Sequence, residues 1–195
     1  MFNMQIKSLA VILSLALSSL VTPASAAVTL NLIPSTTTVN AGNAFSVDVQ
    51  IAGLESTEDL SAFDFNINFN ASVLGFTSYT LGSQLGQLAT FEATDSSSGN
   101  LGNGAINLSE TSLLWDLSAQ ANVFTLATLY FVGNGVGNSA LSFSNVTLGD
   151  AFGEPLVANL QTSAVTVTSV PEPETYAFLL SGFALVGLLR RRNNV

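Results

Sequence analysis

The strongest constraint on the fold is a strict alternation of apolar and polar residues that begins at Phe63. Phenylalanine or isoleucine occupies positions 63, 65, 67 and 69, and Asp64, Asn66, Asn68 and Asn70 follow them in turn. Because successive side chains of a β-strand point to opposite faces, this pattern predicts a strand with one buried and one solvated face. Such strands are typical of an antiparallel sheet that packs on a second sheet.

The same period of two recurs in short segments along residues 27–170, where no stretch keeps a helical period. The predicted strands are Val28–Ile33, Phe45–Ala52, Ala62–Phe69, Leu74–Thr80, Leu88–Ala93, Ala105–Leu108, Phe124–Val132, Ala140–Val146 and Ala164–Thr168. Glycine and asparagine mark predicted turns at Asn40–Asn43, Ser98–Asn100 and Gly133–Asn138. A segment of 144 residues is long enough to bury a core without disulfides. The sequence therefore predicts an all-β fold in the form of one sandwich.

The composition excludes most catalytic chemistry. The chain has no histidine and no cysteine, so it cannot form a Ser-His-Asp triad, a thiol nucleophile or a thiolate metal site. A pair of carboxylates in a cleft is the remaining route to catalysis, and no pattern in the sequence indicates such a pair. We expect a protein that is not an enzyme and has no catalytic residue.

The basic residues lie only near the two ends of the chain. They are Lys7, Arg190, Arg191 and Arg192. Of the 13 acidic residues, only Glu172 and Glu174 lie outside residues 27–170, which leaves eleven carboxylates there and no Lys or Arg. Because nucleic-acid binding depends on Lys and Arg against phosphates, nucleic acid is not an expected partner.

Eleven carboxylates with no basic partner suit a hard cation with oxygen ligands, such as calcium. The predicted loop Asp95–Asn100 is rich in oxygen-bearing side chains, and Glu55, Glu58 and Asp59 fall together in another loop. Neither matches an EF-hand loop, and a solvated acidic surface explains the same residues. We expect no cofactor, with bound calcium as the alternative, and we assign no residue as a metal ligand.

Residues 1–26 have the parts of a secretory signal peptide. Lys7 supplies the positive charge, Leu9–Val21 is the apolar region, and Ala24 and Ala26 are the small residues of a cleavage site. We predict cleavage by signal peptidase between Ala26 and Ala27. An uncleaved membrane anchor is the alternative.

Residues 170–195 form a second targeting segment, at the C-terminal end of the sequence. Pro171, Glu172 and Pro173 precede the apolar run Thr175–Leu189, and the arginines at 190–192 follow it. A helix of this length reaches about 22 Å, against a hydrocarbon core of about 30 Å. The sequence predicts a short transmembrane helix whose arginines stay on the cytoplasmic side of the inner membrane.

This C-terminal pattern resembles the PEP-CTERM sorting signal, in which a Pro-Glu-Pro motif, a short apolar helix and a basic cluster follow one another. The resemblance implies a Gram-negative bacterium that makes exopolysaccharide. It also implies a membrane-embedded exosortase as partner, cleavage near Pro171–Pro173, and release to the cell surface or extracellular matrix. A permanent C-terminal anchor is the alternative.

The central segment resembles a cohesin domain, the sandwich module of cellulosome scaffolds. Similar segments occur in the family's order at Val39–Val49, Leu60–Phe65, Phe69–Leu74, Leu126–Phe131, Leu141–Val146, Asp150–Gly153 and Ser163–Val167. The resemblance covers residues 27–169 and implies a nine-stranded jelly-roll sandwich, a fold shared with carbohydrate-binding modules. The family's Tyr-Asp-Pro turn is replaced here by Phe69-Asn70-Ala71.

Two groups of residues are candidate binding positions. Asp64, Asn66 and Asn68 share the polar face of the predicted strand, and the resemblance places that strand in the partner-binding sheet of cohesins, with an aspartate matching Asp64. An ordinary solvated β-face is the alternative. Trp115, the only tryptophan, precedes Asp116, and an exposed indole beside a polar group suits a sugar ring. A core or rim tryptophan flanked by Leu113, Leu114 and Leu117 is the alternative.

The predicted function is that of a secreted, non-catalytic protein of the envelope or biofilm matrix. Its sandwich would bind polysaccharide or another matrix component. The alternatives are a module that binds a dockerin-like protein partner at the cell surface, and a purely structural matrix protein.

Overall fold

The computed structural model describes residues 27–55, 57–170 and 181–183 and shows an all-β sandwich with almost no helix. The strands are β1 (Thr29–Pro34), β2 (Thr38–Asn40), β3 (Ala44–Ala52), β4 (Ala62–Asn68), β5 (Leu74–Leu81), β6 (Ala93–Asp95), β7 (Gly99–Gly102), β8 (Ala105–Ser112), β9 (Val123–Gly133), β10 (Gly137–Gly149), β11 (Asn159–Leu160) and β12 (Ser163–Thr168). A single 3-10 turn, η1 (Leu88–Thr90), precedes β6.

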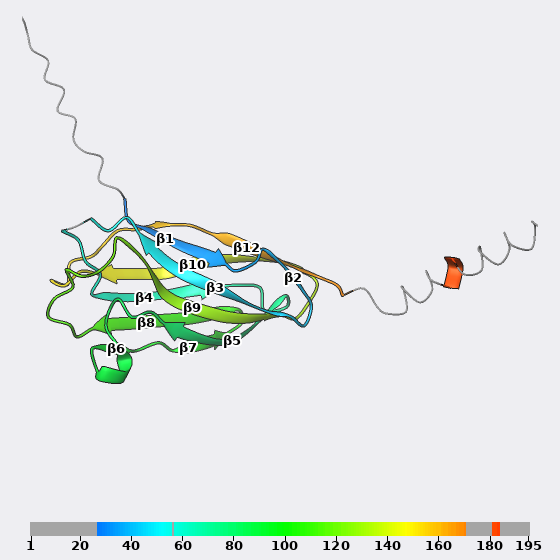
Figure 1. The fold of residues 1–195 in the computed structure, drawn as a ribbon, viewed down its shortest axis with the longest axis horizontal. Helices are drawn as coiled ribbons and strands as arrows, with labels where there is room; N and C mark the ends of the chain where they lie inside the picture. Colours follow the sequence, from blue (N-terminus) through cyan, green and yellow to red (C-terminus); the bar gives the residue numbers. More distant parts are fainter. Residues whose placement is uncertain (1–26, 56, 171–180, 184–195) are drawn as a thin grey trace, which may run out of the picture.

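The strands form two layers (Figure 1). One sheet has the order β11-β1-β3-β9-β5, and the other has the order β2-β12-β10-β4-β8-β6, with β7 paired to β8. Most neighbours are antiparallel; the short strands β11 and β2 are parallel to β1 and β12. Strands β4 and β8 therefore lie inside the larger sheet, and their outer faces form a continuous surface.

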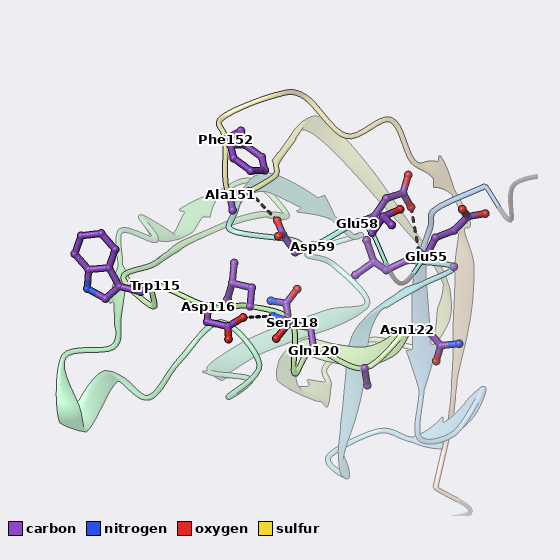
Figure 2. A pocket seen from close by; sticks show the side chains of 15 residues that line it. Glu55, Glu58, Asp59, Trp115, Asp116, Ser118, Gln120, Asn122, Ala151 and Phe152 are labelled. Carbon is purple, nitrogen blue, oxygen red and sulfur yellow. Dashed lines mark hydrogen bonds between the residues drawn. The ribbon is translucent and has the colours of Figure 1, made fainter.

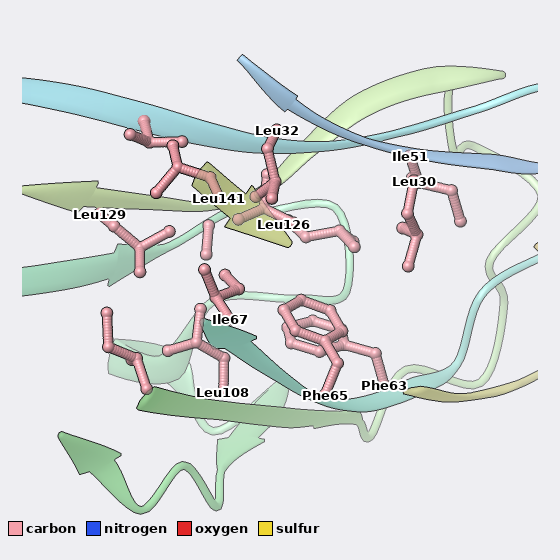
Figure 3. Close-up of a cluster of buried hydrophobic side chains, with 14 of the residues drawn as sticks. Leu30, Leu32, Ile51, Phe63, Phe65, Ile67, Leu108, Leu126, Leu129 and Leu141 are labelled. Atoms are coloured by element: carbon pink, nitrogen blue, oxygen red, sulfur yellow. The ribbon is translucent and has the colours of Figure 1, made fainter. Parts of the chain in front are cut away.

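The core lies between the two sheets and is built by the residues that the alternation predicts. Along β4, Phe63, Phe65 and Ile67 are buried, whereas Asp64 is exposed. Figure 3 shows these side chains opposite leucines and isoleucines of the other sheet. Each fully buried side chain of this size contributes about 1.5–3 kcal/mol to folding. The buried apolar residues all lie between Val28 and Val167, so we expect residues 27–169 to fold on their own.

The described residues form twelve strands where nine were expected, and the predicted strand Leu88–Ala93 is wrong. The segment Leu88–Ala93 contains η1 instead, because Phe91 adopts a left-handed conformation with φ of 59° and its N–H donates to the Leu88 carbonyl. Only Ala93 of this segment enters a strand, as the first residue of β6.

The hairpin between β7 and β8 also differs from expectation. Gly99 and Asn100, predicted to lie in a turn, belong to β7, and the tight turn is at Asn103-Gly104. Both turn residues have positive φ, 52° and 80°, as a two-residue hairpin turn of type I′ requires. Strand β8 also continues past the predicted end at Leu108 to Ser112.

The predictions for the two ends of the chain lie outside the described residues. These are the signal peptide with Ala24 and Ala26, the motif Pro171–Pro173, the arginines at 190–192 and most of the apolar run. Ala27 is exposed and precedes β1, and Ser181–Phe183 form a helical turn. Among the residues that the structure describes, no helix is long and apolar enough to span a membrane.

Candidate binding site

The outer face of β4 and β8 carries a hydrogen-bonded row of polar side chains, which we call the polar face: Asp64, Asn66, Asn68 and Asn107. The Nδ2 group of Asn107 donates to Asp64 Oδ1 at 2.9 Å and to Asn66 Oδ1 at 3.0 Å. Asn68 Nδ2 donates to Ser144 Oγ at 2.9 Å. These bonds link three neighbouring strands and hold the side chains in fixed positions.

Asn107 was not identified from the sequence. The register pairs Asn66 with Asn107, so the two side chains are direct cross-strand neighbours. The alternation of Ala105–Leu108 indicates that Asn107 faces outward, but no local pattern shows that it pairs with Asn66.

A cavity of about 810 Å³ opens at the end of the sandwich where three loops meet. We call it the loop-end cavity. Its lining includes Asp59, Trp115, Asp116, Gln120 and Phe152. Figure 2 shows Phe152 at the top and Trp115 at the left with its indole pointing away from the other lining residues, and the carboxylates of Asp59 and Asp116 lie nearer the middle of the view. The loops lie at the end of the sandwich opposite Val170, where the described part of the domain ends (Figure 1).

Trp115 is fully exposed, with a relative accessibility of 104%. A tryptophan in the core is therefore excluded, whereas a position at the rim is what the structure shows. Leu117 is buried and anchors the loop, whereas Leu113 and Leu114 are themselves exposed. The chain turns outward after β8, and this leaves the indole in solvent at the rim of the cavity.

Hydrogen bonds to backbone groups hold the polar side chains of the loop-end cavity. Asp116 Oδ1 accepts from the Ser118 N–H at 2.9 Å, and hydrogen bonding by Ser118 lowers the pKa of this exposed carboxyl below its ordinary value. Gln120 accepts from the Leu60 N–H at 2.9 Å and donates to the Leu60 carbonyl at 2.8 Å. The cavity therefore presents ionised and amide groups in positions set by the loops.

The loop Asp150–Glu154 brings an aromatic side chain that sequence reasoning missed. Asp59 Oδ1 accepts from the Ala151 N–H at 2.7 Å, and Asp150 Oδ1 accepts from the N–H groups of Phe152 and Glu154 at 2.8 Å. These bonds present Phe152 with 89% of its surface exposed. An aspartate two residues before an aromatic residue is the only sequence signal for such a turn.

The structure places the predicted residues of the polar face and those of the loop-end cavity in separate sites. A second cavity lies beside the first and shares lining residues with it. This cavity, of about 510 Å³, includes Asp64 of the polar face in its lining. Ala151 and Phe152 line both cavities. Asp64 therefore lies on one side of the Phe152 loop, and Trp115 with Asp116 lies on the other.

The two loops considered for calcium use their carboxylates in internal hydrogen bonds. Asp95 accepts from Ser97 and Tyr79, and Glu58 accepts from the Glu55 N–H. Within residues 27–55, 57–170 and 181–183, no three acidic side chains are grouped closely enough to hold a metal ion.

The fold and the two surface sites define a class of protein, the β-sandwich interaction modules. The family model described as the cohesin domain matches residues 30–129, and that described as the PEP-CTERM protein-sorting motif matches residues 169–193. The chain therefore belongs to the cohesin domain family and carries a PEP-CTERM sorting motif. No match is found among curated proteins.

The solved structures that this chain resembles include cohesin modules. The module of a family 33 glycoside hydrolase from Clostridium perfringens is 14% identical, with a TM-score of 0.59, and the alignment covers 74% of this chain and 97% of that one. The sixth cohesin of scaffoldin B from Acetivibrio cellulolyticus, solved in complex with a mutant dockerin, is 21% identical (TM-score 0.58, coverage 72% and 99%). A non-cellulosomal cohesin from Archaeoglobus fulgidus is 14% identical (TM-score 0.56, coverage 78% and 98%).

Proposed function

We propose that this chain is an exported, non-catalytic protein of the cell surface or matrix that binds a polysaccharide at the loop-end cavity. The observation that carries the proposal is the complete exposure of Trp115 at the rim of a cavity lined by polar groups. Apolar side chains that are exposed together beside polar groups mark interaction sites, and Trp115 lines the same cavity as the exposed Phe152.

The chemistry of the cavity suits a sugar chain. Pyranose rings present C–H groups that stack on the face of Trp115, and a second exposed ring, Phe152, stands at the same rim. Asp116 and Asp59 offer acceptors for sugar hydroxyls, whereas the Gln120 amide is already bonded to the backbone of Leu60 and Gln84 and fixes the wall of the cavity. Because the segment 27–170 has eleven carboxylates and no Lys or Arg, we expect it to repel polyanions and to prefer neutral glycans.

The sorting motif supports a route by which the protein is exported and then sorted at the inner membrane. A signal peptide cleaved after Ala26 would start export, and the apolar helix would hold the chain in the inner membrane until an exosortase cuts near Pro171–Pro173. The loop-end cavity lies opposite Val170 (Figure 1), so it would point away from the membrane while the tail is attached.

The single tryptophan gives a direct test. Titration of the segment 27–169 with the producer's exopolysaccharide and with neutral oligosaccharides should quench or shift the Trp115 fluorescence in a saturable way. Polygalacturonate is the polyanionic control and should have no effect. Pull-down with the insoluble polysaccharide, using Trp115→Ala beside Phe91→Ala, supplies the matched comparison, because Phe91 is also exposed but does not line the cavity. Absence of binding by the wild type would refute the proposal.

A second candidate function is supported by the polar face. Its side chains are fixed by hydrogen bonds on neighbouring strands, as suits a rigid protein-docking surface, and one related cohesin was solved with a dockerin. Binding of a surface protein that is lost in an Asp64→Ala/Asn66→Ala variant and retained in Trp115→Ala would favour this function. Absence of both partners would leave a purely structural matrix role.

A further inference from the structure

One side chain of the core breaks the apolar pattern without compensation. Ile106, Leu108 and Glu110 alternate along β8 and face inward, and Glu110 is only 1% exposed. Its Oε1 atom has no hydrogen-bond partner. The other buried polar side chain, Ser139, accepts a bond from the Asn70 N–H and donates to the Ala140 carbonyl. Ionised Glu110 would therefore hold a desolvated charge with at least one carboxylate oxygen unpaired, which is costly.

The neighbours of Glu110 offer no positive charge. The register pairs it with Phe63 of β4 on one side and with Asp95 of β6 on the other. The acidic residue of β4, Asp64, faces outward. The carboxylate of Glu92, just before β6, accepts from the Gln87 N–H. Residues 27–170 contain no Lys, Arg or His at all. Ionised Glu110 would face only the carboxylate of Asp95.

Asp95 also connects the two sheets at their open edge. Its Oδ2 atom accepts from the Tyr79 hydroxyl at 2.8 Å, and Tyr79 belongs to β5, the edge strand of the smaller sheet. Strand β6 is the edge of the larger sheet and pairs only with β8. A charge on Glu110 therefore acts directly on the strand that closes this edge.

We infer that Glu110 is a proton-operated latch for strand β6: the neutral acid lets the Tyr79–Asp95 contact close the edge of the sandwich, and the ionised acid pushes β6 away. The latch is independent of the proposed glycan binding. The two features are nevertheless close along the chain. The Leu113 N–H, two residues before Trp115, donates to the carbonyl of Glu92, which lies just before β6.

The titration of Glu110 falls in a physiological range. Burial, and then the charge of Asp95, raise the pKa of Glu110 from 4.5 to about 7. Because the folded state holds the proton more tightly than the unfolded state, the stabilisation is complete below pH 4.5 and is lost as the pH rises through about 7. The difference between these pKa values corresponds to a change of about 300-fold in the unfolding equilibrium constant.

The test compares unfolding of residues 27–169 between pH 4.5 and 8.5 in wild type, Glu110→Gln and Glu154→Gln. Glu154 is exposed, so its substitution removes the same charge from the surface and should keep the wild-type pH profile. Glu110→Gln should lose most of the pH dependence. Glu110→Leu provides a second variant in case glutamine does not fold, and it should be the most stable form at pH 8.5.

Hydrogen exchange then locates the opening. The amides of Ser96 and Leu113, bonded to the carbonyls of Ser109 and Glu92, should lose protection above pH 7 in wild type more than in Glu110→Gln. Amides in β3 and β9 should not change. Equal pH profiles of wild type and both Glu110 variants would overturn the latch, and so would a pH effect spread evenly over all strands.

Discussion

The polar face and the loop-end cavity lie on either side of the Phe152 loop, yet they are built in different ways. The polar face stands on paired strands, and its side chains bond to one another across the sheet. The loop-end cavity stands on loops, and its side chains bond mainly to backbone groups. The strands supply rigidity and hydrogen-bonding groups to the polar face, whereas the loops supply the exposed rings of Trp115 and Phe152 to the loop-end cavity. A partner that stacks on both rings would bind at the loop end.

The largest effect should come from Trp115→Ala. If the indole stacks on the ligand, its removal costs about 2 kcal/mol of binding, which is about a 30-fold loss of affinity for the polysaccharide. Because Trp115 is fully exposed, the free energy of unfolding should change by less than about 0.5 kcal/mol. Affinity measured by pull-down and stability measured by urea unfolding separate the two effects. Unchanged affinity would move the site away from the loop end.

Asp59→Ala should loosen the loop that the two sites share. It removes the charged acceptor of the Ala151 N–H, and the loss should be about 1.5 kcal/mol of stability. Hydrogen exchange at Ala151 and Phe152 should rise, and glycan affinity should fall in parallel. Asp59→Asn is the control, because it keeps an oxygen acceptor. If the alanine variant keeps a protected Ala151 amide, the carboxylate does not hold the loop.

Asn107→Ala should weaken the polar face alone. The substitution removes the bonds to Asp64 and Asn66 and the acceptor for the Ser98 N–H, with an expected cost of about 1 kcal/mol because the site is half-buried. Glycan affinity should stay at the wild-type value. Asn68→Ala, which loses the bond to Ser144, should cost less. A drop in glycan affinity would show that the two regions act as one site.

The smallest effect should come from Asp64→Asn. The amide oxygen can still accept from Asn107, so stability should change by less than about 0.5 kcal/mol. The substitution removes only the charge of the polar face. A protein partner that depends on this charge would bind more weakly and with less salt dependence, whereas neutral glycan would bind as before.

Particular residues show how far sequence reasoning reaches. The alternation at Phe63–Asn70 correctly predicted which side chains enter the core, because facing is a local property of an extended chain. It failed at Leu88–Ala93, where apolar residues lie in the 3-10 turn η1 and its left-handed end at Phe91. The predicted strand Ala105–Leu108 also ended four residues short of the end of β8 at Ser112, and so the sequence analysis missed Glu110. The sequence did not decide whether Trp115 is exposed or buried, because leucines flank it on both sides.

The sequence by itself determined the class of fold, the inward and outward faces of the long strands, the absence of positive charge from residues 27–170 and the sorting motif at the C-terminus. Each of these follows from local order along the chain. Only the tertiary structure decided that Asn107 bridges Asp64 and Asn66, that Phe152 joins the two cavities, and that Glu110 meets Asp95 beside Tyr79. Asn107 lies 43 positions from Asp64, and Asp59, which holds the Phe152 loop, lies 92 positions from Ala151. Such contacts depend on strand register and loop closure, which no local pattern encodes.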